Sequence, residues 1–381
     1  MNTTAISSEK KEVNNMESQL KLQPFTFENV PSTRPMIIAG PCSAESEQQM
    51  VETATQLAAQ GIKIFRAGIW KPRTRPGSFE GYGSAALPWM KSVKQATGML
   101  TATEVANVRH VYEALKAGID ILWIGARTSV NPFAVQEIAD ALRGVDIPVL
   151  IKNPVNPDLE LWIGAIERFY HAGVTRLAAG HRGFSSHEKL VYRNDPNWQI
   201  PIELRRRIPN IPMFVDPSHI CGNRQYLGEI CQKSMDLNYD GIIIESHINP
   251  DVAMSDAKQQ LTPADLSVLL SKLVLRKEYA DNNSLVTLEE LRAQIDKLDD
   301  QLVDLLEKRM KVAEQIGVCK KENNIAILQT SRWDKIITKR LEEGAKKGLS
   351  AQFIETIFRS IHEESIDHQT KVMNEPKNGN K

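Results

Sequence analysis

The chain has 381 residues, which is long for a single domain and sufficient for two. A hydrophobic content of 41% and a charged content of 25% are typical of a globular protein with a sizeable core. The 47 basic and 47 acidic residues leave no net charge, which argues against nucleic acid or a membrane surface as the partner and requires any anion site to be local.

No apolar run is long enough to span a bilayer, and the polar N-terminal stretch lacks the apolar segment of a signal peptide. We therefore expect a cytoplasmic protein. The cysteines are few and irregularly spaced, which predicts reduced thiols, one of them available as a metal ligand, rather than a disulfide framework. They are Cys42, Cys221, Cys231 and Cys319.

Residues 1–33 are predicted to be a flexible N-terminal arm, within which residues 20–27 form a short segment that docks on the body. Over residues 34–277, short β-rich runs alternate with amphipathic helical stretches. The runs are 36–39, 62–65, 99–102, 121–124, 149–151, 176–179, 213–215 and 241–244. The helical stretches are 47–60, 105–117, 132–142, 159–172, 224–235 and 263–276.

Eight such alternations predict a (β/α)8 barrel, whose strands are apolar throughout because both of their faces are buried. An open doubly wound sheet is the alternative, and we favour it less. In a barrel of this kind the active site lies at the C-terminal ends of the strands.

Four potential metal ligands follow strands that become neighbours when such a barrel closes. Cys42 follows the first strand, His219 the seventh and Glu245 the eighth, and Asp256 stands in the next loop. Mixed sulfur, nitrogen and oxygen donors suit Mn, Fe, Co or Zn better than Mg or Ca. Taken singly, each residue also fits a structural role, so the prediction rests on their combination.

Cations also gather at the strand ends, where they predict a site for a multiply anionic small molecule that carries phosphate. Pro72 stiffens the loop that holds two of them; one or two of the set also fit the role of a solvated or paired surface residue. The cations are Arg66, Lys71, Arg73, Arg127, Lys152 and Arg182.

The stretches GPCSAE, RAGIWKPRT, IGAR, IKNP, DPSH and ESH followed by SDAKQQ resemble the short barrel branch of type I 3-deoxy-D-arabino-heptulosonate-7-phosphate synthases, over residues 34–276. The resemblance implies a metal-dependent condensation of phosphoenolpyruvate with erythrose 4-phosphate at the entry of the shikimate pathway. It implies metal ligation by Cys42, His219, Glu245 and Asp256. It also implies phosphoenolpyruvate binding by Arg66, Lys71, Arg127, Lys152 and Arg182, and erythrose 4-phosphate binding by Arg73 and Thr74.

Two details of this resemblance concern single residues. Lys71 or the metal would assist activation of the water that adds to phosphoenolpyruvate, which makes Lys71 a candidate catalytic residue. The resemblance is loosest at His181 and Arg182, where the family often has Glu-Arg-Gly.

Beyond a predicted linker at 278–286, the pattern becomes helical. Thr287 and Glu290 form a capping box, so we expect a long helix from Thr287, then helices at 331–344 and 350–371 and a tail at 372–381. The apolar stripe of the long helix has one gap, Arg309. Arg309 and Lys320 fall on one face, whereas Arg292 points about 100° away. Arg309 fits either a ligand pocket or an interchain salt bridge that fixes register.

The positions Arg292, Arg309, Lys320, Arg332, Ser365 and Gln369 resemble those of the all-helical chorismate mutases, over residues 287–370. The resemblance implies rearrangement of chorismate to prephenate, with Arg309 and Lys320 as catalytic residues and no covalent chemistry. It also implies a homodimer, or a higher homo-oligomer, in which Arg292 enters the partner's site.

The chain departs from that family at Gln329 and Trp333, where Asp and Glu are usual. We therefore expect a bifunctional enzyme, and keep as an alternative a C-terminal domain that dimerises the barrel and senses chorismate or prephenate as an allosteric module. A synthase that uses arabinose 5-phosphate and makes an octulosonate phosphate is less favoured. Such enzymes usually have Asn-Arg-Ser where this chain has Pro72-Arg73-Thr74.

Overall fold

The structure, a computed structural model, describes residues 20–73, 77–187, 190–276 and 282–374. The chain divides into two compact units, Met1–Glu278 and Tyr279–Lys381. Thr74, residues 1–19 of the predicted arm and residues 375–381 of the predicted tail lie outside the described residues.

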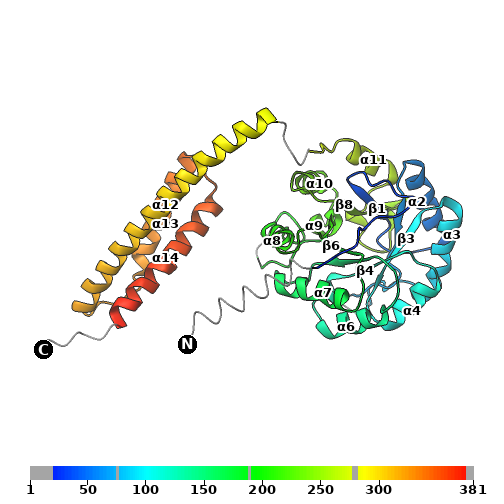
Figure 1. The fold of residues 1–381 in the computed structure, drawn as a ribbon, viewed down its shortest axis with the longest axis horizontal. Coiled ribbons are helices and arrows are strands. Elements are labelled where there is room, and N and C mark those ends of the chain that lie inside the picture. The colour runs from blue at the N-terminus through cyan, green and yellow to red at the C-terminus, as the bar shows by residue number, and fades with distance from the viewer. Residues whose placement is uncertain (1–19, 74–76, 188–189, 277–281, 375–381) are drawn as a thin grey trace. The chain divides into compact units, whose positions relative to one another are not determined.

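Eight parallel strands close into a barrel in the order in which they occur in the chain (Figure 1). Each strand pairs with the next, and β1 closes on β8 with Gly40 opposite Glu245. The barrel prediction is confirmed and the open sheet is excluded. The strands are β1 (Met36–Gly40), β2 (Ile64–Arg66), β3 (Leu100–Val105), β4 (Ile121–Ile124), β5 (Val149–Lys152), β6 (Leu177–His181), β7 (Met213–Val215) and β8 (Gly241–Glu245).

Two apolar cores line the two faces of the strands, because successive side chains point to opposite faces. The residues inside the barrel are Ile38, Ile64, Ala102, Ile121, Trp123, Leu150, Ala178, Phe214 and Ile243. Their outward neighbours, such as Phe65 and Leu122, join a second core beneath the helices. Burial of both faces accounts for the apolar runs seen in the sequence.

Helices surround the barrel (Figure 1). They are α2 (Glu47–Ala59), α3 (Leu87–Thr97), α4 (Val108–Lys116), α5 (Ala126–Ser129), α6 (Pro132–Ala141), α7 (Leu159–His171), α8 (Gln199–Arg207), α9 (Pro217–Cys221), α10 (Leu227–Asp236) and α11 (Pro263–Ser271), with 3-10 turns η1 (Gly83–Ala86), η2 (Pro250–Val252) and η3 (Ala257–Gln259). The predicted helical stretches include neither α3 nor α8. α8 buries only Pro201 and Leu204, too narrow a stripe for periodicity to reveal. α11 ends before the predicted residue 276, because the Lys272 N–H turns back to the carbonyls of Leu269 and Leu270.

The segment that begins at residue 20 packs on the barrel, as predicted. Leu20 and Phe25 are buried, and Phe25 joins the core inside the barrel. Its ring lies 5.6 Å from that of Phe214 and 5.5 Å from that of Phe27. The segment therefore covers the N-terminal end of the barrel, opposite to the strand ends that carry the predicted site.

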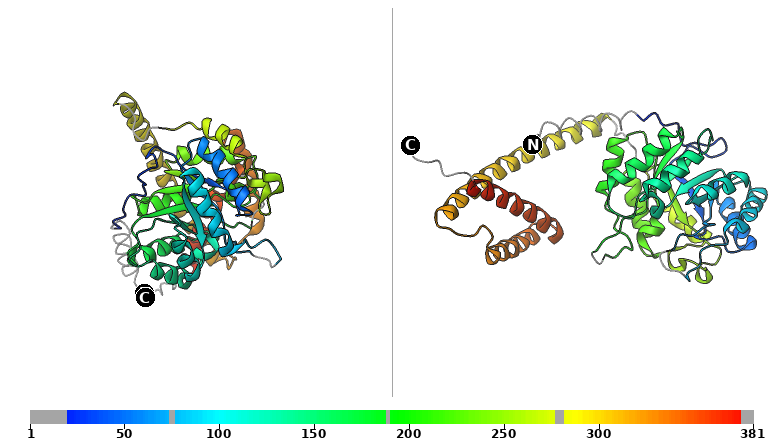
Figure 2. Two further views of the ribbon diagram at one scale, coloured as in Figure 1. Left: turned by 90° about the vertical axis from the view of Figure 1, so that its right-hand side faces the viewer. Right: turned by 90° about the horizontal axis from the view of Figure 1, so that it is seen from below.

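Three helices form the second unit: α12 (Asn282–Glu322), α13 (Thr330–Lys346) and α14 (Ala351–Asn374). Figures 1 and 2 show α12 and α14 side by side, with the first turns of α12 extending beyond α14. A Cβ at Gly344 would lie 2.5 Å from Ile354, so glycine permits the close approach of α13 and α14. Ala313 and Ile354 are the hydrophobic residues that this unit buries within its described part.

The predicted start of the long helix was wrong. α12 begins at Asn282, five residues before Thr287, and so includes residues 282–286 of the predicted linker. Asn and Ser favour helix N-termini as much as loops, so the stretch Asn282-Asn283-Ser284 is compatible with either state. α14 likewise continues to Asn374, three residues into the predicted tail.

A membrane-spanning helix would need a long apolar stretch. Over the described ranges, none of the helices is long and apolar enough to cross a membrane.

Candidate functional sites

The inward-facing side chains of several strands end in an ionisable group. Each of these groups stands two residues after an apolar residue of the core inside the barrel. They are Arg66 on β2, Glu104 on β3, Lys152 on β5, Asp216 after β7 and Glu245 on β8. The period of two places these groups directly above the core, at the C-terminal end of the barrel. All except Glu104 are buried. Strand register therefore places these ionisable groups together, and we call them the floor of the site.

The buried charges of this floor are paired. Arg66 Nη1 lies 3.4 Å from Glu245 Oε1, and Lys152 Nζ donates to Asp216 Oδ2 at 2.6 Å. Burial by itself would raise the pKa of both carboxyl groups. The positive neighbours outweigh burial, His219 and Lys152 at Asp216 and His219 and Arg66 at Glu245, so that both pKa values are lowered. Both side chains are therefore ionised at neutral pH.

Trp123 lies between these charges and was assigned by the sequence only to an apolar strand. Its ring lies 4.9 Å from Arg66 Cζ and 5.4 Å from Lys152 Nζ. Its Nε1 donates to Glu104 Oε2 at 3.1 Å. The sequence pattern could not reveal this contact, because Trp123 is itself a core residue and fits the apolar pattern of its strand.

A cavity opens above the floor, lined by loops that follow the strands. Five of the six predicted cations line it, and Arg66 lies in the floor beneath. The lining residues are Lys71, Pro72, Arg73, Glu104, Gly125, Ala126, Arg127, Lys152, Arg182, Arg193, His219 and Asp256. The six cations, scattered over residues 66–182, are therefore brought to one end of the barrel.

Arg193 is a cation that the sequence analysis missed. Its Nη1 donates to Asp256 Oδ1 and to Gln259 Oε1, both at 3.1 Å. It stands in the long connection after β6, remote from any strand end, so its position in the sequence gave no signal. Arg193 adds a sixth cation to the lining of the cavity.

His181 and Arg182 end β6 with different roles. His181 Nε2 lies 2.6 Å from the Pro196 carbonyl, which only accepts, so Nε2 donates and Nδ1 accepts from the Tyr239 hydroxyl at 3.0 Å. Burial lowers the pKa of His181 to about 4, so the ring is a neutral structural group. Arg182 Nη1 donates to Asn194 Oδ1 at 2.9 Å, and burial lowers its pKa to about 10.

The four predicted metal ligands form two pairs. Cys42 Sγ lies 3.3 Å from Asp256 Oδ2, and His219 Nε2 lies 3.7 Å from Glu245 Oε1. Among the described residues, no three His, Cys, Asp or Glu side chains converge closely enough to hold a metal ion. Within the described ranges, Glu245 Oε1 is buried without a hydrogen-bond partner, its nearest cation being Arg66 Nη1 at 3.4 Å, and a metal ion could bind this oxygen. The donor chemistry and this unpartnered oxygen fit a transition metal, although the geometry is not that of a closed site.

Protein groups hold these donors in place. His219 Nδ1 contacts Asp216 Oδ2 at 2.8 Å, which leaves Nε2 directed towards Glu245. Lys71 Nζ lies 3.1 Å from Cys42 Sγ. Burial, and then the charge of Glu245, raises the pKa of the Cys42 thiol to about 11, so a metal would have to displace its proton.

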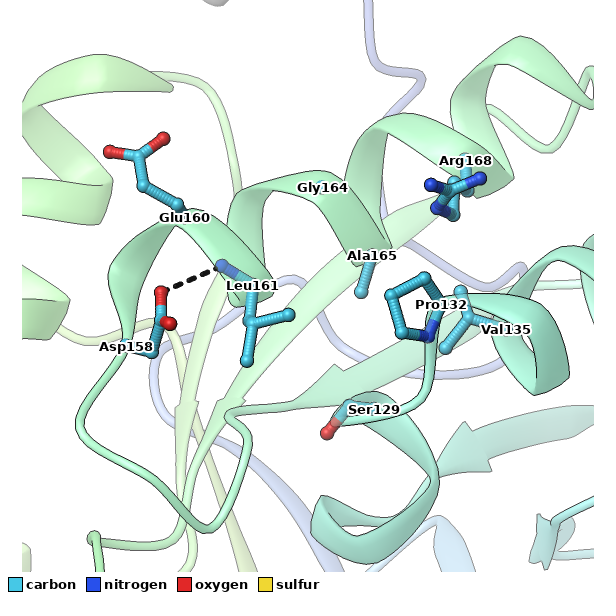
Figure 3. A pocket seen from close by; sticks show the side chains of 9 residues that line it. All are labelled: Ser129, Pro132, Val135, Asp158, Glu160, Leu161, Gly164, Ala165 and Arg168. Carbon is cyan, nitrogen blue, oxygen red and sulfur yellow. Dashed lines mark hydrogen bonds between the residues drawn. The ribbon is translucent and has the colours of Figure 1, made fainter.

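A second cavity, of about 300 Å³, lies on the outside of the barrel between α5, α6 and α7 (Figure 3). Its charged groups already have partners. Asp158 caps α7 through the Leu161 N–H, Glu160 contacts Arg207, and Arg168 donates to Gln136. We assign no ligand to this cavity.

The helical unit has a cavity of its own, of about 340 Å³, between its three helices. Five of the six predicted residues line it. The lining comprises Arg309, Val312, Ala313, Ile316, Lys320, Ile327, Gln329, Arg332, Trp333, Ile336, His362, Ser365, Ile366 and Gln369. None of these is acidic, so three cations face the cavity without a carboxylate in its lining.

Neutral oxygens hold two of these cations. Arg309 Nη1 contacts the Ser365 hydroxyl, and Lys320 Nζ donates to Gln369 Oε1 at 2.9 Å and to the Ile327 carbonyl at 2.6 Å. Such partners orient the cations without neutralising them, so a ligand with negative charges would be bound strongly.

Arg292 does not reach this cavity. It is exposed on α12, where its Nη1 contacts Glu289 Oε1 at 2.6 Å. The sequence had assigned it to a different pocket from Arg309 on the basis of helical angle.

Trp333 and His362 form a stacked pair in the lining, with ring centroids 4.3 Å apart and an interplanar angle of 18°. Burial, and then the charge of Arg309, lowers the pKa of His362. The sequence analysis missed His362, because a single histidine on a helix has no distinguishing pattern.

Comparison with known proteins finds a matching family for each of the two units. The model of the DAHP synthetase I family matches residues 29–281, and that of chorismate mutase type II matches residues 291–370. A phospho-2-dehydro-3-deoxyheptonate aldolase of Thermotoga maritima is 33% identical over 225 residues, which are 59% of this chain and 64% of that protein. The match thus spans slightly less than two thirds of that relative.

More distant relatives and solved structures share the barrel. A 2-dehydro-3-deoxyphosphooctonate aldolase of Geobacter metallireducens is 27% identical, over 63% of this chain and 92% of that protein. The crystal structure of the Thermotoga maritima DAHP synthase superimposes with a TM-score of 0.57 at 30% identity, over 62% of this chain and 68% of that one. A truncated form of the Thermotoga enzyme gives a TM-score of 0.55 at 28% identity, over 62% and 84% of the two chains.

Proposed function

The chain belongs to the DAHP synthetase I family and carries a chorismate mutase type II domain, and on this basis we propose that it is a bifunctional enzyme of the shikimate pathway. The barrel would condense phosphoenolpyruvate with erythrose 4-phosphate, and the helical unit would rearrange chorismate to prephenate. The observation that carries the proposal is the pair of cation-lined cavities, each in the unit whose family acts on an anionic substrate.

In the barrel reaction, carbon three of phosphoenolpyruvate bonds to the aldehyde carbon of the sugar, water adds to carbon two, and phosphate leaves. We assign the phosphoenolpyruvate to Arg66, Lys71, Arg127, Lys152 and Arg182, because these cations lie in the floor and lining of one cavity. Arginine forks would grip its carboxylate and phosphate and hold carbon three towards the sugar.

The sugar phosphate would lie against Arg73 and Thr74, of which Arg73 is within the described residues. Arg73 Nε donates to the Phe79 carbonyl at 2.8 Å, and its Nη1 lies 3.5 Å from Asp256 Oδ2. These contacts hold the guanidinium in the lining of the cavity, where it could bind the phosphate of the sugar.

Cys42, His219, Glu245 and Asp256 would hold the divalent transition metal on which enzymes of this family generally depend. When bound, the metal supplies a Lewis acid for the sugar aldehyde. Lys71 contacts the Cys42 sulfur; burial would lower its pKa, but the charges of Cys42 and Glu245 outweigh burial and raise it. Lys71 therefore stays protonated and acts as a donor to developing negative charge.

In the helical unit, Arg309 and Lys320 would hold the two carboxylates of chorismate and stabilise charge that develops as its ether bond breaks. Arg332, Ser365 and Gln369 complete the lining. Rearrangement needs only that the substrate be held in a compact conformation, so no nucleophile or base is required.

We further infer that α12 pairs with α12 of a second copy. Its stripe of leucines and isoleucines before Arg309 is 39–62% exposed, and the partner helix α14 lies beside the later part of α12. An apolar stripe of this length on one helix is typical of a coiled-coil seam. Such pairing would carry Arg292, seventeen residues before Arg309, towards the partner's cavity.

Two assays test the main proposal. Phosphate release from phosphoenolpyruvate should require erythrose 4-phosphate and should stop when a metal chelator is added. The same protein should consume chorismate without erythrose 4-phosphate and in the presence of the chelator. Turnover with arabinose 5-phosphate but not with erythrose 4-phosphate would favour an octulosonate-phosphate synthase, the activity named for the Geobacter relative.

A third assay addresses the alternative of a sensing module, which the absence of acidic residues from the helical cavity keeps open. If chorismate is bound but not consumed, and prephenate slows phosphate release only while residues 279–381 are present, the helical unit is regulatory rather than catalytic.

A further inference from the structure

Trp123 packs against two cations of the barrel floor. It is 1% exposed and belongs to the core inside the barrel, together with Ile121 of the same strand. Arg66 comes to its ring from β2 and Lys152 from β5. The two cations therefore share one aromatic surface from opposite sides of β4 in the sheet order.

The Arg66 guanidinium has few hydrogen-bond partners beside the Trp123 ring. Arg66 Nη2 donates to the Cys42 carbonyl at 3.3 Å, and its Nη1 lies 3.4 Å from Glu245 Oε1, whereas its Nε is buried without a hydrogen-bond partner among the described residues. An aromatic face attracts a cation but does not occupy its in-plane N–H groups as a carboxylate would. The ring therefore adds to the compensation that Glu245 gives the buried guanidinium, and it leaves Nε–H as a donor for a ligand.

The edge of the same ring fixes a third charged group. Trp123 Nε1 donates to Glu104 Oε2 at 3.1 Å, and Glu104 lines the cavity. Gly125 makes room for that carboxylate, since a Cβ there would lie 2.0 Å from Glu104 Oε1. One indole thus contacts side chains from β2, β3 and β5.

We propose that Trp123 is a positioning residue for the anionic substrate of the barrel, which holds the side chains of Arg66 and Lys152 against its ring and leaves the Nε–H of Arg66 available to that substrate. The inference rests on the proposed synthase function and extends it to a residue that touches no substrate. If the ring were an ordinary core side chain, replacing it would change only the stability of the fold. The proposal predicts that replacing it also weakens the binding of the anionic substrate.

A graded series tests the role of the ring. Tryptophan at position 123 is replaced by its mono-, di- and trifluorinated forms, which keep the shape and the N–H but progressively weaken the attraction of the ring for cations. Titration calorimetry with phosphoenolpyruvate and the metal-loaded full chain should show a dissociation constant that rises with each fluorine, to about tenfold overall, while kcat at saturation changes less than twofold. A dissociation constant that is flat along the series would overturn the proposal.

Two substitutions complete the design. Trp123→Leu should weaken phosphoenolpyruvate binding by more than tenfold. The control Phe214→Leu removes another ring of the inner core, one that packs against Phe25, and should leave binding within twofold. Equal loss of affinity in both variants would mean that Trp123 is only a core residue. If the wild-type protein neither binds phosphoenolpyruvate nor releases phosphate, the proposed synthase function itself is wrong.

Discussion

The barrel buries the apolar residues of its strands, whereas α12 leaves its apolar stripe in contact with solvent. Leu150 on β5 is 1% exposed, while Leu298 on α12 is 61% exposed. Burial of apolar area is the main force that stabilises a fold, and a large exposed apolar patch is typical of an interaction surface. The exposed stripe of α12 is therefore the observation behind the proposed pairing of two chains, and the barrel strands have no such stripe within their described residues.

The cations of the two units also differ in their partners. In the barrel floor, Arg66 and Lys152 face the carboxylates of Glu245 and Asp216, so an incoming anion competes with groups already present. In the helical cavity, Arg309 and Lys320 face a hydroxyl, an amide and a carbonyl, which are neutral groups. An anion that enters the helical cavity therefore meets cations without a carboxylate among the described lining residues, in contrast to the paired charges of the barrel floor.

The largest expected effect separates the chemistry of the two units. Cys42→Ala should remove the metal and lower phosphate release by about a thousandfold, ~4 kcal/mol of barrier, with chorismate turnover unchanged. Metal content and both rates are measured on one preparation. Cys319→Ser, on the exposed surface of α12, is the matched control and should change neither rate. Full metal content in Cys42→Ala would show that the ligand set is wrong.

The reciprocal change acts on the helical unit. Arg309→Ala should lower kcat for chorismate by about a hundredfold or more, because it removes charge stabilisation that no other lining group replaces. Phosphate release should be unaffected. Arg359→Ala deletes an arginine that is paired with Glu355 on the same unit and does not line the cavity. Retention of chorismate turnover in Arg309→Ala would refute the assignment of the cavity.

The exposed stripe provides a direct test of the contrast in burial. Leu298→Glu should weaken dimer association by about a hundredfold, ~3 kcal/mol, because it places a charge in an apolar seam. Sedimentation velocity over a concentration series gives the dissociation constant. Ala293→Glu adds the same charge on the opposite side of α12 and should leave the dimer intact. A monomeric wild-type protein would contradict the pairing.

The smallest expected effect concerns the stability of the barrel in acid. The pKa of His181 is about 4 in the folded state against 6.5 for an ordinary histidine, so between these values only the unfolded chain takes up the proton. The contribution is fully present above pH 6.5 and is lost as the pH falls towards 4. Between pH 7 and 5 it should lower the free energy of unfolding by about 2 kcal/mol.

His181→Gln keeps hydrogen-bonding groups at that position but does not titrate. Urea unfolding of the wild type and of His181→Gln should give stabilities that converge as the pH falls from 7 to 5. A difference between them that does not change with pH would show that His181 does not titrate as its burial predicts.

Much of the fold could be predicted because its signals are local. Short runs of apolar residues, their alternation with amphipathic stretches and the polar residues after each strand indicated the barrel and the end that carries its site. Predictions of boundaries were less successful. Thr287 had a capping-box partner in Glu290, yet α12 begins at Asn282, because a helix can continue through a good cap when the residues before it are also compatible with helix.

The sequence by itself determined which residue types stand at the strand ends and on the helical stripes, since these depend on neighbours within a few positions. Only the tertiary structure decided which of them meet. Closing of the barrel brings Arg66 to Glu245 and Lys152 to Asp216, and turns Trp123 from a core residue into the surface that two cations share. Contacts between residues so distant in the chain depend on the closure of the whole sheet, which no local pattern encodes.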